Sequence, residues 1–134
     1  MKAVYTGLFT PHEDHVSVHV PDMPSCITFG RDLADALNMA ADALNEILIV
    51  MEDEHLPIPE PRPLSEIEVP DGAIPSMIVV DTELKRIMDD ARAVRKNISM
   101  PVWMAYRVDQ LGLNLSQFVQ EALRAQFGFQ PGNA

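Results

Sequence analysis

The stretch that decides the fold of the first part of the chain is HVSVHVPDMPSCITFGRDLADALNMAADALNEILIVM, residues 15–51. At its start apolar and polar residues alternate, which places Val16, Val18 and Val20 on one face of a half-buried β-strand. After a turn that contains two prolines, residues 25–30 have the length and composition of another strand. The first half of the stretch therefore predicts two strands joined by a short turn.

The second half of the stretch predicts a long α-helix. Asp32 precedes this helix, and its side chain can cap the first turn. The apolar residues that follow recur at the spacing of a single helix face, namely Leu33, Leu37, Ala40, Leu44, Ile47, Leu48 and Met51. We expect this face to cover one side of a small sheet.

The flanking segments complete a first domain. Residues 3–9 have the composition of a strand, and with the two strands that follow they predict an antiparallel meander. Five prolines between residues 55 and 73 predict an extended connection, because proline fixes φ and removes a backbone donor. Residues 74–80 are again strand-like, with Pro75 at a strand start or a sheet edge. The expected architecture of residues 1–81 is thus β-β-β-α-β, in the α+β class.

A short helix is expected over residues 82–94, where it connects this domain to a second one, residues 95–134. Its inward face would consist of Leu84, Ile87, Met88 and Ala91.

Charge is distributed unevenly along the chain. The net charge of the whole sequence is −10, but residues 1–90 carry five basic and eighteen acidic residues, a net charge of −13. Residues 91–134 carry five basic and two acidic residues, a net charge of +3. This asymmetry predicts a basic protein as partner of the first part and nucleic acid as partner of the second. A solvated acidic surface without a partner is the alternative.

Cysteine usage and hydropathy indicate the compartment. The single cysteine, Cys26, cannot form an intramolecular disulfide, and no stretch resembles a signal peptide or a membrane span. A cytoplasmic protein is therefore expected. Cys26 lies in an apolar run and is expected to be a small buried side chain, not a nucleophile.

A second informative stretch is RKNISMP, residues 95–101. In an extended conformation it directs Ile98 and Met100 to one face of a strand. The other face carries the polar residues Arg95, Asn97 and Ser99. Pro101 can start a helix, because the N–H groups of a first turn have no intrahelical partner.

Two short helical patterns follow this strand. The first has an apolar stripe of Met104, Val108 and Leu111. Gly112 can adopt the left-handed conformation that ends a helix, and Asn114 with Gln117 suits a cap for the next one. The inner face of the second helix is formed by Leu115, Phe118, Val119, Ala122 and Leu123, and the helix is expected to end at Gly128 and Pro131.

This strand-helix-helix order, with Asn-Ile-Ser-Met-Pro at the strand and Asn-Leu-Ser-Gln-Phe opening the second helix, resembles ribbon-helix-helix repressors. The resemblance covers residues 95 to about 127. One strand with two short helices cannot close a core, so two copies must pair their strands and interleave their helices. The predicted dimer core consists of Ile98, Met100, Met104, Val108, Leu111, Phe118, Val119 and Ala122.

A two-stranded antiparallel ribbon fits the major groove of DNA, where its outward residues read base edges. Lys96 and the N–H groups at the start of the second helix are expected to contact phosphate. The predicted DNA-binding residues are Arg95, Lys96, Asn97, Ser99, Asn114 and Ser116. Many ribbon-helix-helix proteins carry more basic residues before the second helix than this chain does at residues 113–115, so the affinity of one dimer is expected to be modest.

The first part of the chain, residues 3–52, resembles the N-terminal domain of HicB antitoxins. The matching residues are the first strand through Phe9, the turn near His12-Glu13-Asp14, the run from 20 to 30, and a helix with Asp32, Leu33, Ala36, Ala40, Ala43 and Leu44. The resemblance implies a partial ribonuclease-H-like domain that binds and neutralises a HicA-type toxin, which cleaves messenger RNA. It also implies that the C-terminal domain represses the shared operon, as a homodimer or tetramer that is not an enzyme and needs no cofactor.

A ligand- or metal-responsive ribbon-helix-helix repressor is the second hypothesis, because His12, His15 and His19 are close in sequence. On one strand face His15 and His19 would lie about 13 Å apart, too far for a single ion to bridge without help from another element. Known nickel-responsive repressors of this type also carry the DNA-binding unit first, whereas here it is last.

A metal-dependent nuclease is the third hypothesis, since ribonuclease-H enzymes hold two metal ions with clustered carboxylates. Asp14 and Asp22 lie in turns, where aspartate is common for local reasons. The short domain shows no full set of acidic residues at adjacent strand ends. We therefore expect no catalytic residues and no metal site.

Overall fold

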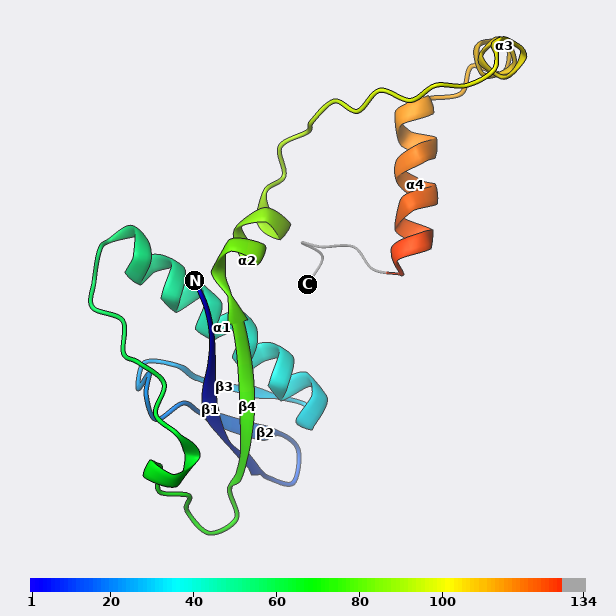
Figure 1. The fold of residues 1–134 in the computed structure, drawn as a ribbon. Coiled ribbons are helices and arrows are strands. Elements are labelled where there is room, and N and C mark those ends of the chain that lie inside the picture. Colours follow the sequence, from blue (N-terminus) through cyan, green and yellow to red (C-terminus); the bar gives the residue numbers. More distant parts are fainter. Residues whose placement is uncertain (129–134) are drawn as a thin grey trace. The chain divides into compact units, whose positions relative to one another are not determined.

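The computed structural model describes residues 1–128 and divides into two compact units, the first spanning Met1–Ile87 and the second beginning at Met88 (Figure 1). The boundary falls inside the helix α2. The elements are β1 (Lys2–Pro11), β2 (Val16–His19), β3 (Ile27–Gly30), α1 (Leu33–Asp53), a 3-10 turn η1 (Leu64–Glu66), β4 (Ile74–Asp81), α2 (Thr82–Asp89), α3 (Val102–Gln110) and α4 (Leu115–Phe127).

The first unit is built on a four-stranded sheet with the order β3-β2-β1-β4, in which all neighbouring strands are antiparallel. The strand β1 pairs on both sides, with Phe9 opposite Val18 and Tyr5 opposite Ile78. The predicted β-β-β-α-β order and meander are confirmed. Pro75 lies near the start of the edge strand β4, where its missing N–H costs little, as the sequence indicated.

The core of the first unit lies between α1 and one face of the sheet (Figure 1). Burial of these apolar side chains stabilises the unit by about 1.5–3 kcal/mol for each large one. The predicted inward face of β2 is confirmed, because its valines are buried. The sheet contributes Tyr5, Phe9, Val16, Val18, Ile78 and Val80, the residue just after β2 contributes Val20, and α1 contributes Ala36, Ala40, Leu44 and Leu48.

The first turn of α1 confirms one prediction and corrects another. The Asp32 carboxylate accepts a hydrogen bond from the Asp35 backbone N–H at 2.8 Å, so the predicted cap is present. Leu33 was expected on the buried face but is 43% exposed, whereas Ala36 is fully buried. The helix meets the sheet at Ala36, whose backbone lies so close to Gly30 in β3 that a Cβ at residue 30 would clash with it, and Leu33 lies outside this contact.

The turn between β2 and β3 is longer than predicted. The strand β3 begins at Ile27, so Cys26 lies in the turn, where its backbone N–H donates to the Met23 carbonyl at 2.8 Å. Cys26 is buried, as expected, and burial raises the pKa of its thiol. This environment disfavours the thiolate and suits a small packing side chain.

The proline-rich connection is irregular, as predicted, apart from η1. It is fastened to the sheet at two points. The buried carboxylate of Asp22 accepts hydrogen bonds from the Arg62 backbone N–H at 2.9 Å and from the Arg62 Nε. The Tyr5 hydroxyl donates to the Pro59 carbonyl at 2.7 Å. These bonds hold a segment whose own backbone has few partners.

The connecting helix is shorter than predicted. The helix α2 ends at Asp89, not at residue 94, and residues 90–101 have no regular structure. Leu84 and Ile87, which were expected to face inward, are 53% and 69% exposed, so no buried face supports a longer helix. The Asp90 carboxylate instead accepts a hydrogen bond from the Arg92 backbone N–H at 3.0 Å.

The second unit contains the two predicted helices. The strand predicted before Pro101 does not form in one copy, because, within the described chain, residues 95–100 have no neighbouring strand to pair with. Asn114 caps α4 by accepting from the Gln117 backbone N–H at 3.1 Å, and Gly112 and Gly128 have the left-handed φ values 60° and 74° expected at helix ends. Pro101 occupies the N-cap position of α3, without a side-chain hydrogen bond, and precedes the first helical residue, Val102. The predicted stop at Pro131 lies outside the described residues.

We predict that Gly30→Ala lowers the free energy of unfolding of the first unit by about 1–3 kcal/mol, because an added Cβ would lie 2.2 Å from the Ala36 backbone nitrogen. Urea denaturation followed by circular dichroism measures the change. Ile27→Ala, on the same strand but 71% exposed, is the control and should shift stability by no more than about 0.5 kcal/mol. Equal stability of Gly30→Ala and wild type would contradict this account of the helix-sheet contact.

Candidate functional site

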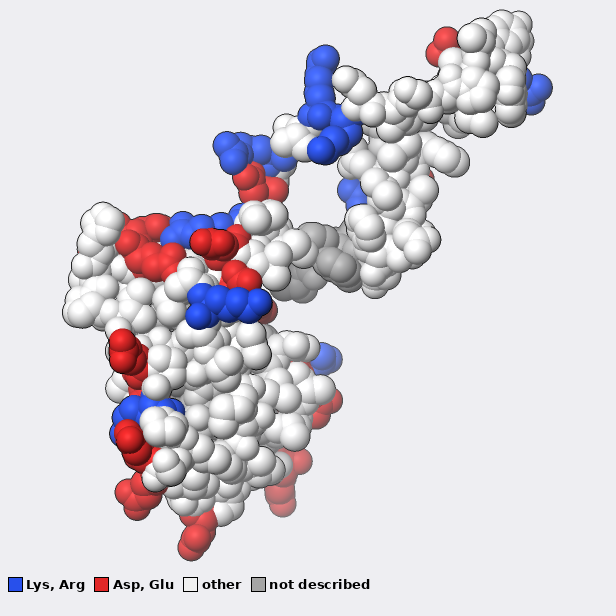
Figure 2. Space-filling model, in the orientation of Figure 1, with Lys and Arg blue, Asp and Glu red and all other residues white. Residues whose placement is uncertain are grey.

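The predicted DNA-contacting residues lie in two places in the second unit. Arg95, Lys96, Asn97 and Ser99 are exposed in the extended segment before α3, and in the described part of the chain none of these side chains has a hydrogen bond or an ion pair. Figure 2 shows basic side chains along this segment, while acidic ones gather mainly over the first unit. Asn114 and Ser116 lie at the start of α4, where the Asn114 side chain is already engaged as a cap.

Arg92 is a basic residue near this segment that was not among the predicted DNA-binding residues. The guanidinium of Arg92 pairs with the Asp90 carboxylate at 2.6 Å, which raises the pKa of Arg92 and lowers that of Asp90. Both groups are exposed, so the pair adds little to stability. It does place a carboxylate beside the Arg92 guanidinium, whereas Arg95 and Lys96 have no such partner among the described residues.

The residues of the predicted dimer core are not buried within one copy of the chain. No residue of α3 or α4 is buried, and Leu111 and Phe118 are 64% and 58% exposed. The set Ile98, Met100, Met104, Val108, Leu111, Phe118, Val119 and Ala122 is exposed or only partly covered. Two further large side chains, Trp103 and Tyr106, are also exposed on α3. As far as residue 128, the second unit therefore lacks a core of its own.

The three histidines considered for a metal site, His12, His15 and His19, do not converge on one point. The rings of His12 and His15 stack with their centroids 4.4 Å apart, whereas His19 lies exposed at the end of β2. The His15 Nδ1 lies 2.6 Å from the Asp14 carboxylate, a hydrogen bond that lowers the pKa of Asp14. Within residues 1–128 no group of three or more His, Cys, Asp or Glu side chains is arranged to hold a metal ion.

The two carboxylates considered for a metal-dependent nuclease site, Asp14 and Asp22, do not lie together either. Asp22 is committed to Arg62 in the first unit's connection, and Asp14 is exposed in the turn between β1 and β2 next to His15. The hollow beside this turn, about 370 Å³ in volume, is lined by Asp14, His15, Phe29, Gly30 and Arg31, with a single carboxylate among them.

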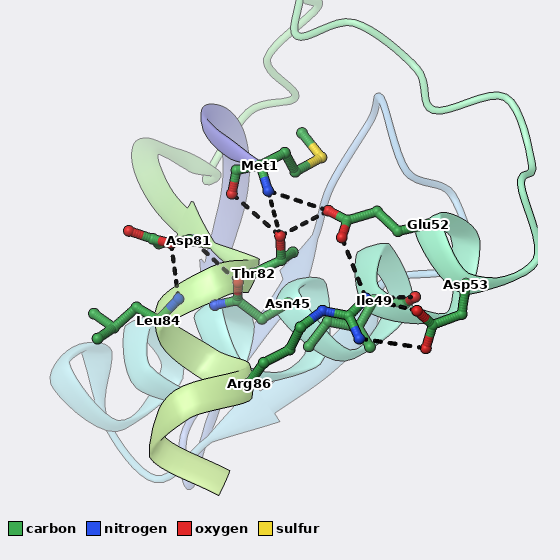
Figure 3. A network of polar contacts seen from close by, with 9 residues as sticks. All are labelled: Met1, Asn45, Ile49, Glu52, Asp53, Asp81, Thr82, Leu84 and Arg86. Atoms are coloured by element: carbon green, nitrogen blue, oxygen red, sulfur yellow. Dashed lines mark hydrogen bonds and ion pairs between the residues drawn. The ribbon is translucent and has the colours of Figure 1, made fainter. Parts of the chain in front are cut away.

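A network of polar contacts fastens α2 to the C-terminal end of α1 (Figure 3). The Arg86 guanidinium donates to the carboxylates of Asp53 at 2.8 Å and Glu52 at 3.3 Å. The buried hydroxyl of Thr82 donates to Glu52 at 2.7 Å. The Asn45 side chain accepts from the Asp81 backbone N–H at 3.1 Å. This network sets the direction in which the chain leaves the first unit.

Sequence reasoning missed this network, and no local signal could have revealed it. Its partners are 30 to 36 residues apart in the chain, whereas sequence patterns report on neighbours within one or two helical turns. The hydrogen bond from Thr82 contributes most to the lowered pKa of Glu52, followed by the bond from Arg86.

Comparison with known proteins places this arrangement in context. A family model described as HicB_like antitoxin of bacterial toxin-antitoxin system matches residues 7–122. An uncharacterized 14.9 kDa protein in the rep-hol intergenic region of Haemophilus phage HP1 is 30% identical over 98 residues, 72% of each chain.

The matches to solved structures of similar fold cover both units of this chain. A toxin-antitoxin complex from Streptococcus pneumoniae matches with a TM-score of 0.58 and 20% identity, covering 94% of this chain and 99% of that one. The antitoxin HicB of Burkholderia pseudomallei matches with a TM-score of 0.52 and 19% identity, covering 92% and 96%. Across the described residues, no helix is both long enough and apolar enough to cross a membrane.

We predict that Glu52→Gln weakens the attachment of α2 and reduces the loss of stability in acid. Because the pKa of Glu52 is lowered in the folded chain, its contribution is present above the ordinary carboxyl pKa of 4.5 and is lost as the pH falls through the folded value. Urea denaturation at pH 7 and at pH 4 measures this effect. The control is Glu46→Gln, an exposed carboxyl on the same helix. The same pH dependence in Glu52→Gln and wild type would refute the role of the network.

Proposed function

The chain belongs to the family of HicB-like antitoxins of bacterial toxin-antitoxin systems, and from this we propose that its first unit neutralises a small basic HicA-like toxin while its second unit represses the shared operon. The observation that carries the proposal is the extent of the family match, which runs from β1 through most of α4 and so includes both units. In this proposal the protein is an antitoxin and an autorepressor in the cytoplasm, and not an enzyme.

Charge supports the assignment of partners to units. Residues 1–90 carry a net charge of −13 and residues 91–134 a net charge of +3. An acidic surface accelerates association with a basic protein, and a basic segment lowers the free energy of binding to phosphates. We assign the toxin to residues 1–81, within a partial ribonuclease-H-like domain, and the operator DNA to residues 95–134.

The absence of a core in the second unit supports a dimer. Large apolar side chains such as Leu111 and Phe118 gain about 1.5–3 kcal/mol each when they leave water, and nothing described in one copy covers them. A second copy would cover them if the two extended segments paired as an antiparallel ribbon and the helices interleaved, as in a ribbon-helix-helix dimer. Arg95, Asn97 and Ser99 would then lie on the outer face of the ribbon, which fits the DNA major groove.

We predict that the small basic protein encoded beside this gene stops growth when expressed alone, and that co-expression of the full chain restores growth and yields a stable complex. The variant Arg95→Ala is the control and should neutralise equally well, because its change lies outside the acidic unit. A neighbouring product that is harmless, or that fails to bind, would overturn the antitoxin assignment.

We predict that Arg95→Ala and Asn97→Ala each weaken binding to the DNA upstream of the gene by about 1–3 kcal/mol and relax its base preference. The reason is the loss of hydrogen bonds to base edges, which phosphate contacts cannot replace. Fluorescence anisotropy at one fixed salt concentration measures the affinity. Arg31→Ala, which removes an exposed cation from the first unit, should leave it unchanged. Unchanged affinity of both segment variants would disprove the assigned contact residues.

A further inference from the structure

An apolar groove lies on the first unit between α1 and the turn that joins β2 to β3. Its volume is about 440 Å³, and most of its lining is apolar. Val50 on α1 and Leu56 just beyond it remain 52% and 46% exposed. The lining consists of Met23, Ser25, Glu46, Ile47, Val50, Met51 and Leu56. No core function accounts for Val50, because the buried stripe of α1 runs along the opposite side of the helix.

Carboxylates follow the same side of α1 and its C-cap. Asp42 and Glu46 are exposed and lie four residues apart, and the exposed C-cap Glu54 follows eight residues after Glu46, with Val50 midway between them. Within the described chain these three carboxylates have no ion pair and no side-chain hydrogen bond. Like charges four residues apart repel each other and weaken a helix. These carboxylates therefore make no stabilising charge interaction within the first unit, and they suit a positively charged partner.

The uncovered face of the sheet is the competing surface. Val4 and Val79 face each other there on β1 and β4 and are 46% and 58% exposed. Strand alternation places the cation Lys2 on the same face. The carboxylate opposite it, Asp81, accepts a hydrogen bond from the Leu84 backbone N–H at the start of α2. Glu66 and Glu68 of the proline-rich connection lie beside this face only at its other end, next to Leu8, His19 and Arg62. Around Val4 and Val79 the strands thus carry one cation and one engaged carboxylate, whereas three unpaired carboxylates flank the groove, and charge complementarity favours the groove for a basic partner.

We infer that the groove is the docking site for the basic toxin, with an apolar toxin side chain against Val50 and Leu56 and flanking Lys or Arg side chains against Asp42, Glu46 and Glu54. This inference rests on the proposed function and specifies which surface performs it. An apolar centre with a charged rim is the usual composition of a specific protein interface. The apolar contact supplies affinity, and the carboxylates accelerate association.

The variant Val50→Lys tests this inference with little risk to the fold. The new ammonium would lie four residues after Glu46 and four before Glu54, so it would lie within reach of two carboxylates that have no ion pair now. The melting temperature should therefore stay the same or rise. Binding of the purified basic protein encoded beside the gene should weaken at least tenfold, because a positive charge would occupy the centre of its site.

The matched control is Val79→Lys, which places the same charge at a similarly exposed valine on the uncovered sheet face. Its affinity for the basic protein should equal that of the wild type. A second variant, Glu46→Gln, should slow association at low salt and lose this effect at high salt. Calorimetry and stopped-flow kinetics on the full chain provide these measurements.

The outcomes separate this inference from the proposed function. A selective loss in Val50→Lys supports the groove as the toxin site. If the wild type binds but Val50→Lys binds equally well, or only Val79→Lys is impaired, the groove assignment is wrong while the antitoxin function stands. If Val50→Lys instead lowers the oligomeric mass of the free protein, the groove contacts a second copy and the assignment is likewise wrong. If the wild type does not bind, the proposed function itself fails.

Discussion

The close packing of α1 on the sheet is the interaction on which the first unit depends. At its tightest point the backbone of Gly30 in β3 meets the first turn of the helix at Ala36, with no room for a side chain between them. Ala40, Leu44 and Leu48 continue the contact along the helix. Because this stripe is buried against the sheet, the opposite side of α1 is presented to solvent, and its acidic residues and apolar groove become available to a partner.

The junction after the sheet is fixed by polar contacts. Arg86 and Thr82 tie the start of α2 to the carboxylates at the end of α1, so the chain leaves the first unit from one defined place. Regular structure stops at Asp89, and residues 90–101 continue without it. A defined exit followed by an irregular segment suits a protein whose two units bind different partners.

The second unit shows the opposite balance of forces. Its helices have well-formed ends, with a side-chain cap at Asn114 and left-handed glycines at 112 and 128, yet they bury no residue. Local interactions thus specify the helices, while the apolar free energy that would hold them together is still to be gained. In the proposed dimer that energy comes from a second copy, which would couple folding of the second unit to its assembly.

The sequence by itself determined the features that depend on near neighbours: the alternating valines of β2, the cap at Asp32, the ends of α3 and α4, and the order of elements in the first unit. It also determined the division of charge between the two units, on which the proposed classes of partner rest. Only the tertiary structure decided that Asp22 holds Arg62, that Glu52 holds Thr82, and that α2 ends at Asp89. The physical reason is that these outcomes depend on groups 30 to 40 residues apart, or on burial that a local pattern cannot report, as with the exposed Leu84 and Ile87.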